Sequence, residues 1–274
     1  MFLVSVAVLV PVLLLAAGRE WSPEVLNRLG SLLPADAGLG SGQLAVSFAA
    51  GLVIAGTPLH VLMRYLSTVV HELGHAFTAG LLGGRPRNIT ISLDASGLAV
   101  YQPPLTWGRG RASLVSFAGY PAPAVASLAA VEALRLGYSR TWFTFAAATL
   151  AVSIVLLIRN FWGFLWTSCV VAGSYLAARE VAAQYLGMAA GALAGYLALE
   201  GIRNARVQMA FVRRYPGTGT DAERIAGWWR FSPTFVSAVH FLTVVAISGY
   251  ASTRALGPHW SAVEDFVRDL LDGS

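Results

Sequence analysis

The segment that decides both fold and chemistry reads His71-Glu72-Leu73-Gly74-His75, in the middle of the apolar run 61–82. A helix turns about 100° per residue, so side chains four positions apart share one face. His71 and His75 can therefore direct two imidazoles at one metal ion, while Glu72 is better placed to reach a water molecule. This is the H-E-x-x-H pattern of zinc hydrolases, with two histidine ligands and a glutamate general base.

The alternative is that these three polar side chains only satisfy one another inside a helix bundle. Placing several ionisable groups in a membrane helix is costly, so such groups usually mark a functional site. The motif is also rare by chance in a chain with five histidines. We therefore expect Glu72 to be catalytic and His71 and His75 to bind Zn2+.

The composition is that of a polytopic membrane protein. Hydrophobic residues make up 56% of the 274 residues and charged residues only 12%. The net charge of +5 comes from arginines spread over short loops, which indicates topology and contact with lipid headgroups and not nucleic-acid binding. With Cys169 as its single cysteine, the chain has neither an internal disulfide nor a multi-cysteine metal site.

Apolar runs separated by short polar segments predict an all-α polytopic membrane protein of about eight transmembrane helices. The expected spans are 2–17, 44–60, 61–82, 112–134, 141–158, 161–178, 181–202 and 232–250. Run 2–17 could instead be a signal peptide, but no basic segment precedes it, so we expect a retained span. This divides the chain into N-terminal spans and linker (1–60), a membrane core (61–250) and an amphipathic tail (251–274).

Two polar or helix-breaking features interrupt these spans. The sequence Gly119-Tyr120-Pro121-Ala122-Pro123 should kink the helix 112–134 and let its backbone approach a neighbour. Asn160 separates the spans 141–158 and 161–178, and we expect it to cap a helix end and not to act in the site.

Directly after the motif helix the pattern changes from the helical to the strand period. Ile89-Thr90-Ile91-Ser92-Leu93 alternates apolar and polar residues, 94–97 reads as a turn, and 98–102 as a returning strand. This short β-hairpin is either an ordinary loop closure or an edge that pairs with an extended peptide. In the second case the substrate-binding residues would be Ile89, Ile91, Leu98 and Val100.

The arginine distribution predicts the orientation in the membrane. With the N-terminus outside, thirteen of the nineteen arginines lie on the cytosolic side and six on the outer side, as the positive-inside rule requires. This orientation places the hairpin and the loop around Asp221 on the same side as the C-terminal end of the motif helix.

A catalytic zinc site usually has three protein ligands, and the motif supplies two. Residue chemistry leaves the third ligand open, although sidedness favours Asp221 and Glu223. The other candidates are His60, Asp94, Glu132, Glu180, Glu200, His240 and His259.

The chain resembles the site-2-protease family of intramembrane zinc metalloproteases, in particular a compact bacterial branch without accessory domains. The likeness covers roughly 62–247 and rests on His71-Glu72-Leu73-Gly74-His75-Ala76, Gly83-Gly84-Arg85, Ala118-Gly119-Tyr120-Pro121-Ala122-Pro123 and Gly219-Thr220-Asp221-Ala222. It implies that Asp221 is the third ligand, although the more familiar family motif is Asp-Gly and here Ala222 follows.

The resemblance also implies the reaction and its setting. Zn2+ would lower the pKa of a water molecule towards about 7, and Glu72 would take its proton and pass it to the leaving amine. The substrate would be a single-span membrane protein in a lipid bilayer, cleaved near the cytosolic face in regulated intramembrane proteolysis. The expected location is a bacterial inner or plasma membrane, and the oligomeric state stays undefined.

Two rival functions are weighed against the protease. An inactive membrane scaffold of the same fold has no use for a general base, so Glu72 argues against it. A metal or solute transporter usually shows internal repeats and polar sites on both sides of the membrane, whereas the polar chemistry here lies on one side.

Overall fold

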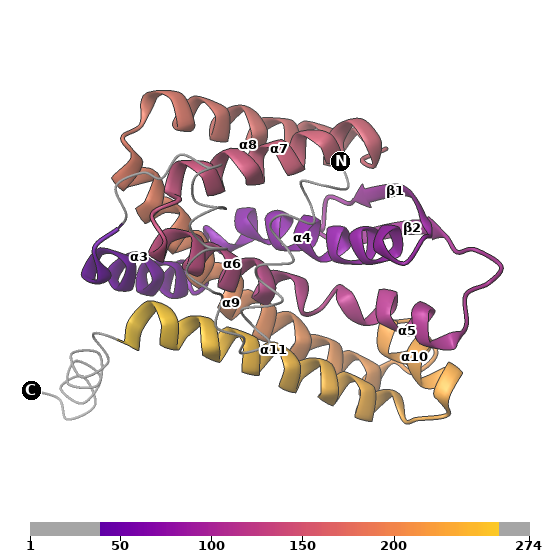
Figure 1. The fold of residues 1–274 in the computed structure, drawn as a ribbon. Coiled ribbons are helices and arrows are strands. Elements are labelled where there is room, and N and C mark those ends of the chain that lie inside the picture. Colours follow the sequence, from indigo (N-terminus) through magenta and orange to yellow (C-terminus); the bar gives the residue numbers. More distant parts are fainter. Residues whose placement is uncertain (1–38, 258–274) are drawn as a thin grey trace, which may run out of the picture.

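A computed structural model describes residues 39–257, with nine helices and one two-stranded sheet in that range (Figure 1). The helices are α3 (Ser41–Ile54), α4 (His60–Leu81), α5 (Arg109–Ala118), α6 (Ala122–Arg135), α7 (Ser139–Leu156), α8 (Phe161–Glu180), α9 (Ala183–Arg214), α10 (Asp221–Trp229) and α11 (Pro233–Leu256). The predicted span 2–17 and most of the predicted tail lie outside the described residues.

Four of these helices, α7, α8, α9 and α11, are long and apolar enough to cross a membrane, and the bent pair α5–α6 makes a fifth. Helix α3 has 14 residues and so measures about 21 Å, less than the roughly 30 Å hydrocarbon core. Helix α4 carries the polar motif and Arg64, which lower its hydropathy. The largely helical membrane fold is confirmed, and the count of eight spans is not.

The predicted kink lies between α5 and α6, which are bent by 63°. Pro121 lacks an N–H to continue the helical hydrogen bonds, and Gly119 and Tyr120 form the turn before it. The single span expected at 112–134 is thus two helices joined by a turn.

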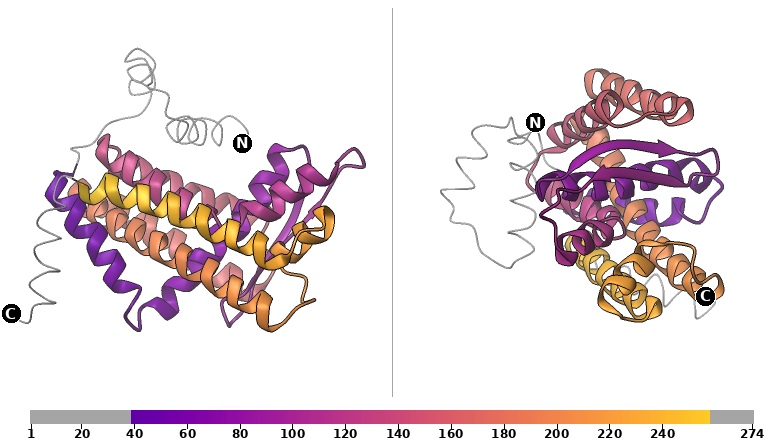
Figure 2. Two further views of the ribbon diagram at one scale, coloured as in Figure 1. Left: turned by 90° about the horizontal axis from the view of Figure 1, so that it is seen from below. Right: turned by 90° about the vertical axis from the view of Figure 1, so that its right-hand side faces the viewer.

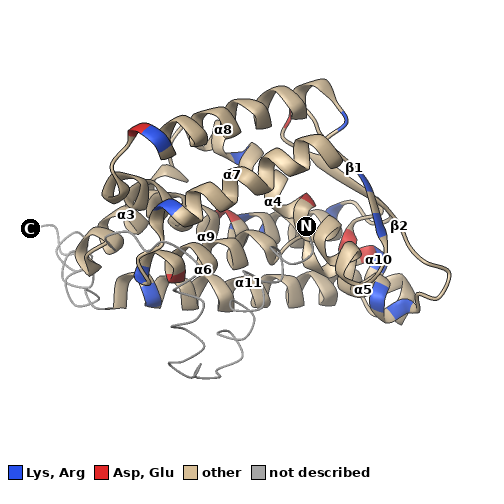
Figure 3. Ribbon diagram, turned by 45° about the horizontal axis from the view of Figure 1, so that its top comes forward, with Lys and Arg blue, Asp and Glu red and all other residues tan. Residues whose placement is uncertain are grey.

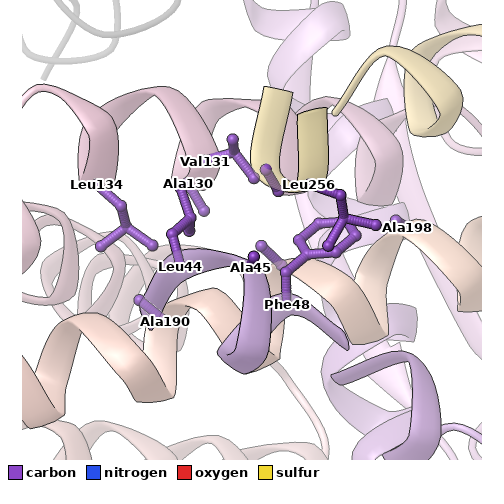
Figure 4. Close-up of a cluster of buried hydrophobic side chains, with 11 residues drawn as sticks. Leu44, Ala45, Phe48, Ala130, Val131, Leu134, Ala190, Ala198 and Leu256 are labelled. Atoms are coloured by element: carbon purple, nitrogen blue, oxygen red, sulfur yellow. The ribbon is translucent and has the colours of Figure 1, made fainter. Parts of the chain in front are cut away.

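Helix α9 is the centre of the bundle, with α3, α6 and α11 packed against it (Figure 2). Its contact with α3 is made through small residues: a Cβ at Gly195 would overlap the Phe48 carbonyl, and a Cβ at Gly51 would lie 2.7 Å from the Tyr196 nitrogen. Around this contact lies the main hydrophobic core (Figure 4). Its larger side chains are Leu44, Phe48, Val131, Leu134 and Leu256.

The predicted hairpin is present as β1 (Arg85–Ile91) and β2 (Gly97–Gln102), paired antiparallel with Ile89 opposite Ala99. It folds back along α4, to which its turn is fastened by the hydroxyl of Thr68, which donates to the Ala95 carbonyl at 2.7 Å. The hairpin therefore runs beside the motif and does not simply close a loop (Figure 1).

The polar stretch 203–230 is more ordered than the sequence indicated. Helix α9 continues to Arg214, twelve residues beyond the predicted end at 202, because Ala205, Gln208 and Val212 keep one buried face. After a short turn the chain forms α10, which packs against α5 and α11.

The close α3–α9 contact predicts that Gly195→Ala destabilises the protein by about 1–3 kcal/mol, because the added methyl group overlaps a carbonyl in a packed interface. Gly173→Ala is the matched control: this glycine is also helical, and a Cβ there meets nothing within 4 Å. Thermal unfolding in detergent measures both variants. Equal stability of the two variants would contradict the close packing.

Candidate active site

Helix α4 brings the two motif histidines together as their spacing predicts. The Nε2 atoms of His71 and His75 lie 3.2 Å apart, and the two rings meet edge to face at 4.8 Å. Both nitrogens point towards the bend between α5 and α6, where a Cβ on Gly119 would lie 2.6 Å from the His71 Nε2 atom.

Asp221 reaches the same point from α10, of which it is the first residue. Its Oδ2 atom lies 3.2 Å from the His75 Nε2 atom and 3.8 Å from the His71 Nε2 atom. Among the described residues, these three form the one group of His, Cys, Asp or Glu side chains that could hold a metal ion. Of the candidates that residue chemistry left open, Asp221 is the one that lies beside both histidines.

A capping box places Asp221. The Thr220 hydroxyl accepts from the Glu223 backbone N–H at 3.3 Å, and the Glu223 carboxylate accepts from the Thr220 backbone N–H at 2.9 Å. Gly217 and Gly219, with φ of 86° and 77°, make the turn that leads into this helix start. The sequence Gly-Thr-Asp-Ala therefore supplies a rigid helix start whose first side chain faces α4.

The other candidate ligands are engaged elsewhere. His240 bonds to Gln208 through Nδ1 at 3.0 Å, and His60 lies 3.4 Å from Glu200. The remaining described candidates have their own partners: Asp94 with Ser96, Glu132 with Arg254, Glu180 with Arg179, and Glu223 with Thr220. His259 lies outside the described residues.

The three ligand atoms fit a tetrahedral zinc ion. Ligands about 2.0–2.1 Å from such an ion stand roughly 3.3 Å apart, close to the spacings seen between these side chains. The His75 Nδ1 atom lies 2.7 Å from the Val115 carbonyl; this contact requires Nδ1 to carry the proton, which leaves Nε2 free to bind a metal. Burial raises the pKa of the Asp221 carboxyl, but the neighbouring imidazoles outweigh this and hold that pKa below its ordinary value.

Glu72 lies beside the ligands but faces the hairpin. Its side chain is buried, lies near the Ala99 backbone N–H, and fits against Gly97, where a Cβ would lie 2.6 Å from the Glu72 Oε1 atom. The Glu72 carboxylate thus lies between the three candidate ligands and strand β2.

Three residues support the site in a way that was not foreseen from the sequence. The Tyr120 ring packs edge to face on His71 at 4.7 Å, and the His240 ring stacks on Tyr120 at 5.1 Å. Gly119 gives the ligand atoms their room. The kink motif was the signal for both Gly119 and Tyr120, but spacing alone does not show that the bend meets α4.

The structure corrects the predicted role of two hairpin residues. Ile89 and Ile91 are fully buried in the core between the hairpin, α4 and the α7–α8 connection, so their side chains offer no surface to a substrate. Leu98 and Val100 are 51% and 42% exposed, and for these two substrate contact stays a prediction.

The outer edge of β1 is closed. Ile89 donates to the Leu157 carbonyl at 2.7 Å and accepts from the Arg159 N–H at 3.1 Å. The Asn160 amide accepts from the Ile91 N–H at 3.0 Å and donates to the Ile91 carbonyl at 2.6 Å. Asn160 precedes α8 as expected, but its side chain does not cap that helix; it pairs with the strand instead.

Within residues 39–257, the free edge of the hairpin belongs to strand β2. Because successive residues of a strand point their backbone groups to opposite sides, β1 turns Asn88 and Thr90 towards Val100 and Leu98. The backbone groups of Gly97, Ala99 and Tyr101 then point away from β1. On that side Ala99 lies next to Glu72. The open edge therefore faces the candidate site.

Comparison with known proteins agrees with this geometry. Neither curated proteins nor solved structures gave a significant match. A family model described as Peptidase M50B-like matches residues 44–251, a range that begins in α3, ends in α11 and includes all four site residues. The resemblance to site-2 proteases noted from the motifs is confirmed: this chain belongs to the Peptidase M50B-like family of membrane metallopeptidases.

Proposed function

We propose that this protein is a zinc-dependent intramembrane endopeptidase that hydrolyses peptide bonds of membrane-anchored proteins. The observation that carries the proposal is the meeting of His71, His75 and Asp221 at one point, with Glu72 beside them. Family membership supports metallopeptidase chemistry in general. His71, His75 and Asp221 would hold Zn2+, which when bound supplies a Lewis acid for the scissile carbonyl and for water.

Glu72, Ala99 and Tyr120 have separate roles in the proposed reaction. The Glu72 carboxylate takes the proton from the attacking water and delivers it to the nitrogen of the leaving amine. The Ala99 N–H orients this carboxylate, and Tyr120 holds the His71 ring from the side. The buried position of Glu72 excludes bulk water from the carboxylate.

The substrate binds as an added strand on the open edge of β2. A helical membrane segment has no free backbone groups, so it must unwind before its peptide bonds can reach the site. An unwound segment regains hydrogen bonds by pairing with the strand edge, and Leu98 and Val100 contact its side chains. A single-span membrane protein is the substrate class that fits this requirement.

The cellular setting follows from the same features. Several apolar helices and the family support a multi-pass membrane protein. We place it in a bacterial inner or plasma membrane, with the site near the cytosolic face as the arginine distribution predicts. An inactive scaffold is the alternative function, and a transporter is less well supported, since the ligands and Glu72 form a single site.

Two substitutions should lower zinc retention. Asp221→Ala removes a ligand, and Gly119→Ala puts a methyl group 2.6 Å from the His71 Nε2 atom, so we expect each to weaken zinc binding roughly tenfold or more. Gly110→Ala is the control, because a Cβ there meets nothing within 4 Å. Metal analysis after dialysis measures the zinc content. Full retention by Asp221→Ala would show that another residue is the ligand.

Glu72→Gln should keep the bound zinc and lose cleavage of a model single-span substrate. Removing a general base lowers kcat by about 10²–10⁴-fold, whereas the amide leaves the metal ligands in place. Zinc content and cleavage rate are measured on the same preparation. Undiminished cleavage would refute the proposed mechanism, and loss of zinc would mean that Glu72 holds the site together instead.

Leu98→Asp should raise KM about tenfold with little change in kcat, because it removes apolar contact worth roughly 1–2 kcal/mol from the side of the open edge. Leu93→Asp is the matched control: Leu93 is 71% exposed but lies before the hairpin turn. Steady-state kinetics on one membrane substrate separates the two parameters. The same KM for both variants would remove Leu98 from the substrate-binding surface.

A further inference from the structure

The end of the molecule where the hairpin, α5 and α10 meet carries a group of arginines, which we call the basic rim (Figure 3). It consists of Arg85, Arg87, Arg109, Arg111, Arg224 and Arg230, all of them exposed. The elements are held together here: Arg109 donates to the Trp228 carbonyl at 3.1 Å, and the Trp229 indole donates to Ser113 at 2.8 Å.

The charge of the basic rim is poorly compensated by the acidic residues near it. Asp221 faces the two histidines, and only Arg224 approaches it, at 4.0 Å. Glu223 is used by its own helix start. Arg87 donates to the neutral side chain of Gln102. Across residues 39–257, the side chains of Arg85 and Arg111 have no hydrogen bond or ion pair. An excess of positive charge therefore stands free at this end.

The open edge of β2 leads from the site to this rim. At its start, Gly97 contacts Glu72. At its end, Gln102 is held by Arg87 of the rim. An extended chain advances about 3.3 Å per residue, so a peptide paired with this edge enters the rim within roughly three to five residues of Glu72.

We propose that the basic rim binds an acidic segment of the substrate, placed a few residues from the scissile bond. The inference rests on the proposed function, because it concerns the chain that leaves the same strand edge. Arginine guanidinium groups form paired, charge-assisted hydrogen bonds with carboxylates, and six of them near one exit attract a short acidic run more strongly than any single contact.

The basic rim would also discriminate against membrane proteins whose flanking segments are positively charged. On the cytosolic side most single-span proteins carry Lys and Arg next to the membrane. Such flanks meet like charges at the rim, whereas an acidic flank meets opposite charges. Anionic lipid headgroups carry the same sign as an acidic flank, so the two are separated by measuring cleavage in uncharged detergent and again with anionic lipid.

The test compares model substrates that share one membrane segment and one scissile region. They differ only in a flanking triplet of Asp, Asn or Arg, which is placed either before or after the scissile region. Cleavage is measured in uncharged detergent for the wild type and for Arg85→Glu/Arg111→Glu. We expect the wild type to prefer Asp over Asn over Arg flanks on one side, by about tenfold in kcat/KM, with less preference at high salt. The double variant, in which two of the six rim arginines are replaced, should lose most of this preference, and its faster cleavage of the Arg substrate than the wild type shows that it is folded.

Arg179→Glu serves as the control, since Arg179 is exposed on α8 outside the rim, and it should keep the wild-type order. A wild type that shows no flank preference in detergent but is stimulated by anionic lipid, with no such stimulation of the double variant, would assign the rim to headgroups and overturn the proposal. Equal cleavage of all flanks by the wild type would also overturn it, while Glu72-dependent cleavage leaves the proposed function intact. Cleavage that does not depend on Glu72 would contradict both the proposed function and the proposed role of the basic rim.

Discussion

The structure depends on one constraint: groups that must be polar for chemistry have to be held among helices that are otherwise apolar. The pairing of α4 with α10 meets this constraint. Asp221 brings its carboxylate to the two imidazoles of His71 and His75, so three costly side chains satisfy one another at one point. The bend at Gly119 makes room for these side chains, and the capping box of Thr220 and Glu223 fixes the start of α10.

Much of this could be predicted from the sequence, because the decisive signals are local. The spacing of His71 and His75 defines one helix face, the alternation at 89–93 defines a strand, and the Gly-Pro segment defines a kink. What could not be predicted are contacts between distant segments. Spacing does not show that Asp221 lies nearer the histidines than His240 does, nor that Ile89 and Ile91 turn inwards. The count of eight spans is not confirmed, because α3 is short and α4 carries its polar site within an apolar run.

Asn160 shows how little is needed to direct a strand edge. Its single amide satisfies both backbone groups of Ile91, and the α7–α8 connection satisfies Ile89. One side of the hairpin is thereby closed with no third strand, and the other stays open beside Glu72. An unpaired strand edge can pair with any extended chain. Because the β1 edge is closed, such pairing is limited to the β2 edge, which lies beside the site.

A hairpin with a single open edge also restricts the positions that a paired chain can take along it. A chain laid along β2 can shift only by whole residue pairs if its side chains are to keep their faces, because a shift of one residue exchanges the two faces. The distance between a bound segment and Glu72 is then counted in steps of about 7 Å. Such a site would locate the bond to be cut by main-chain register, largely independent of which side chains the segment carries.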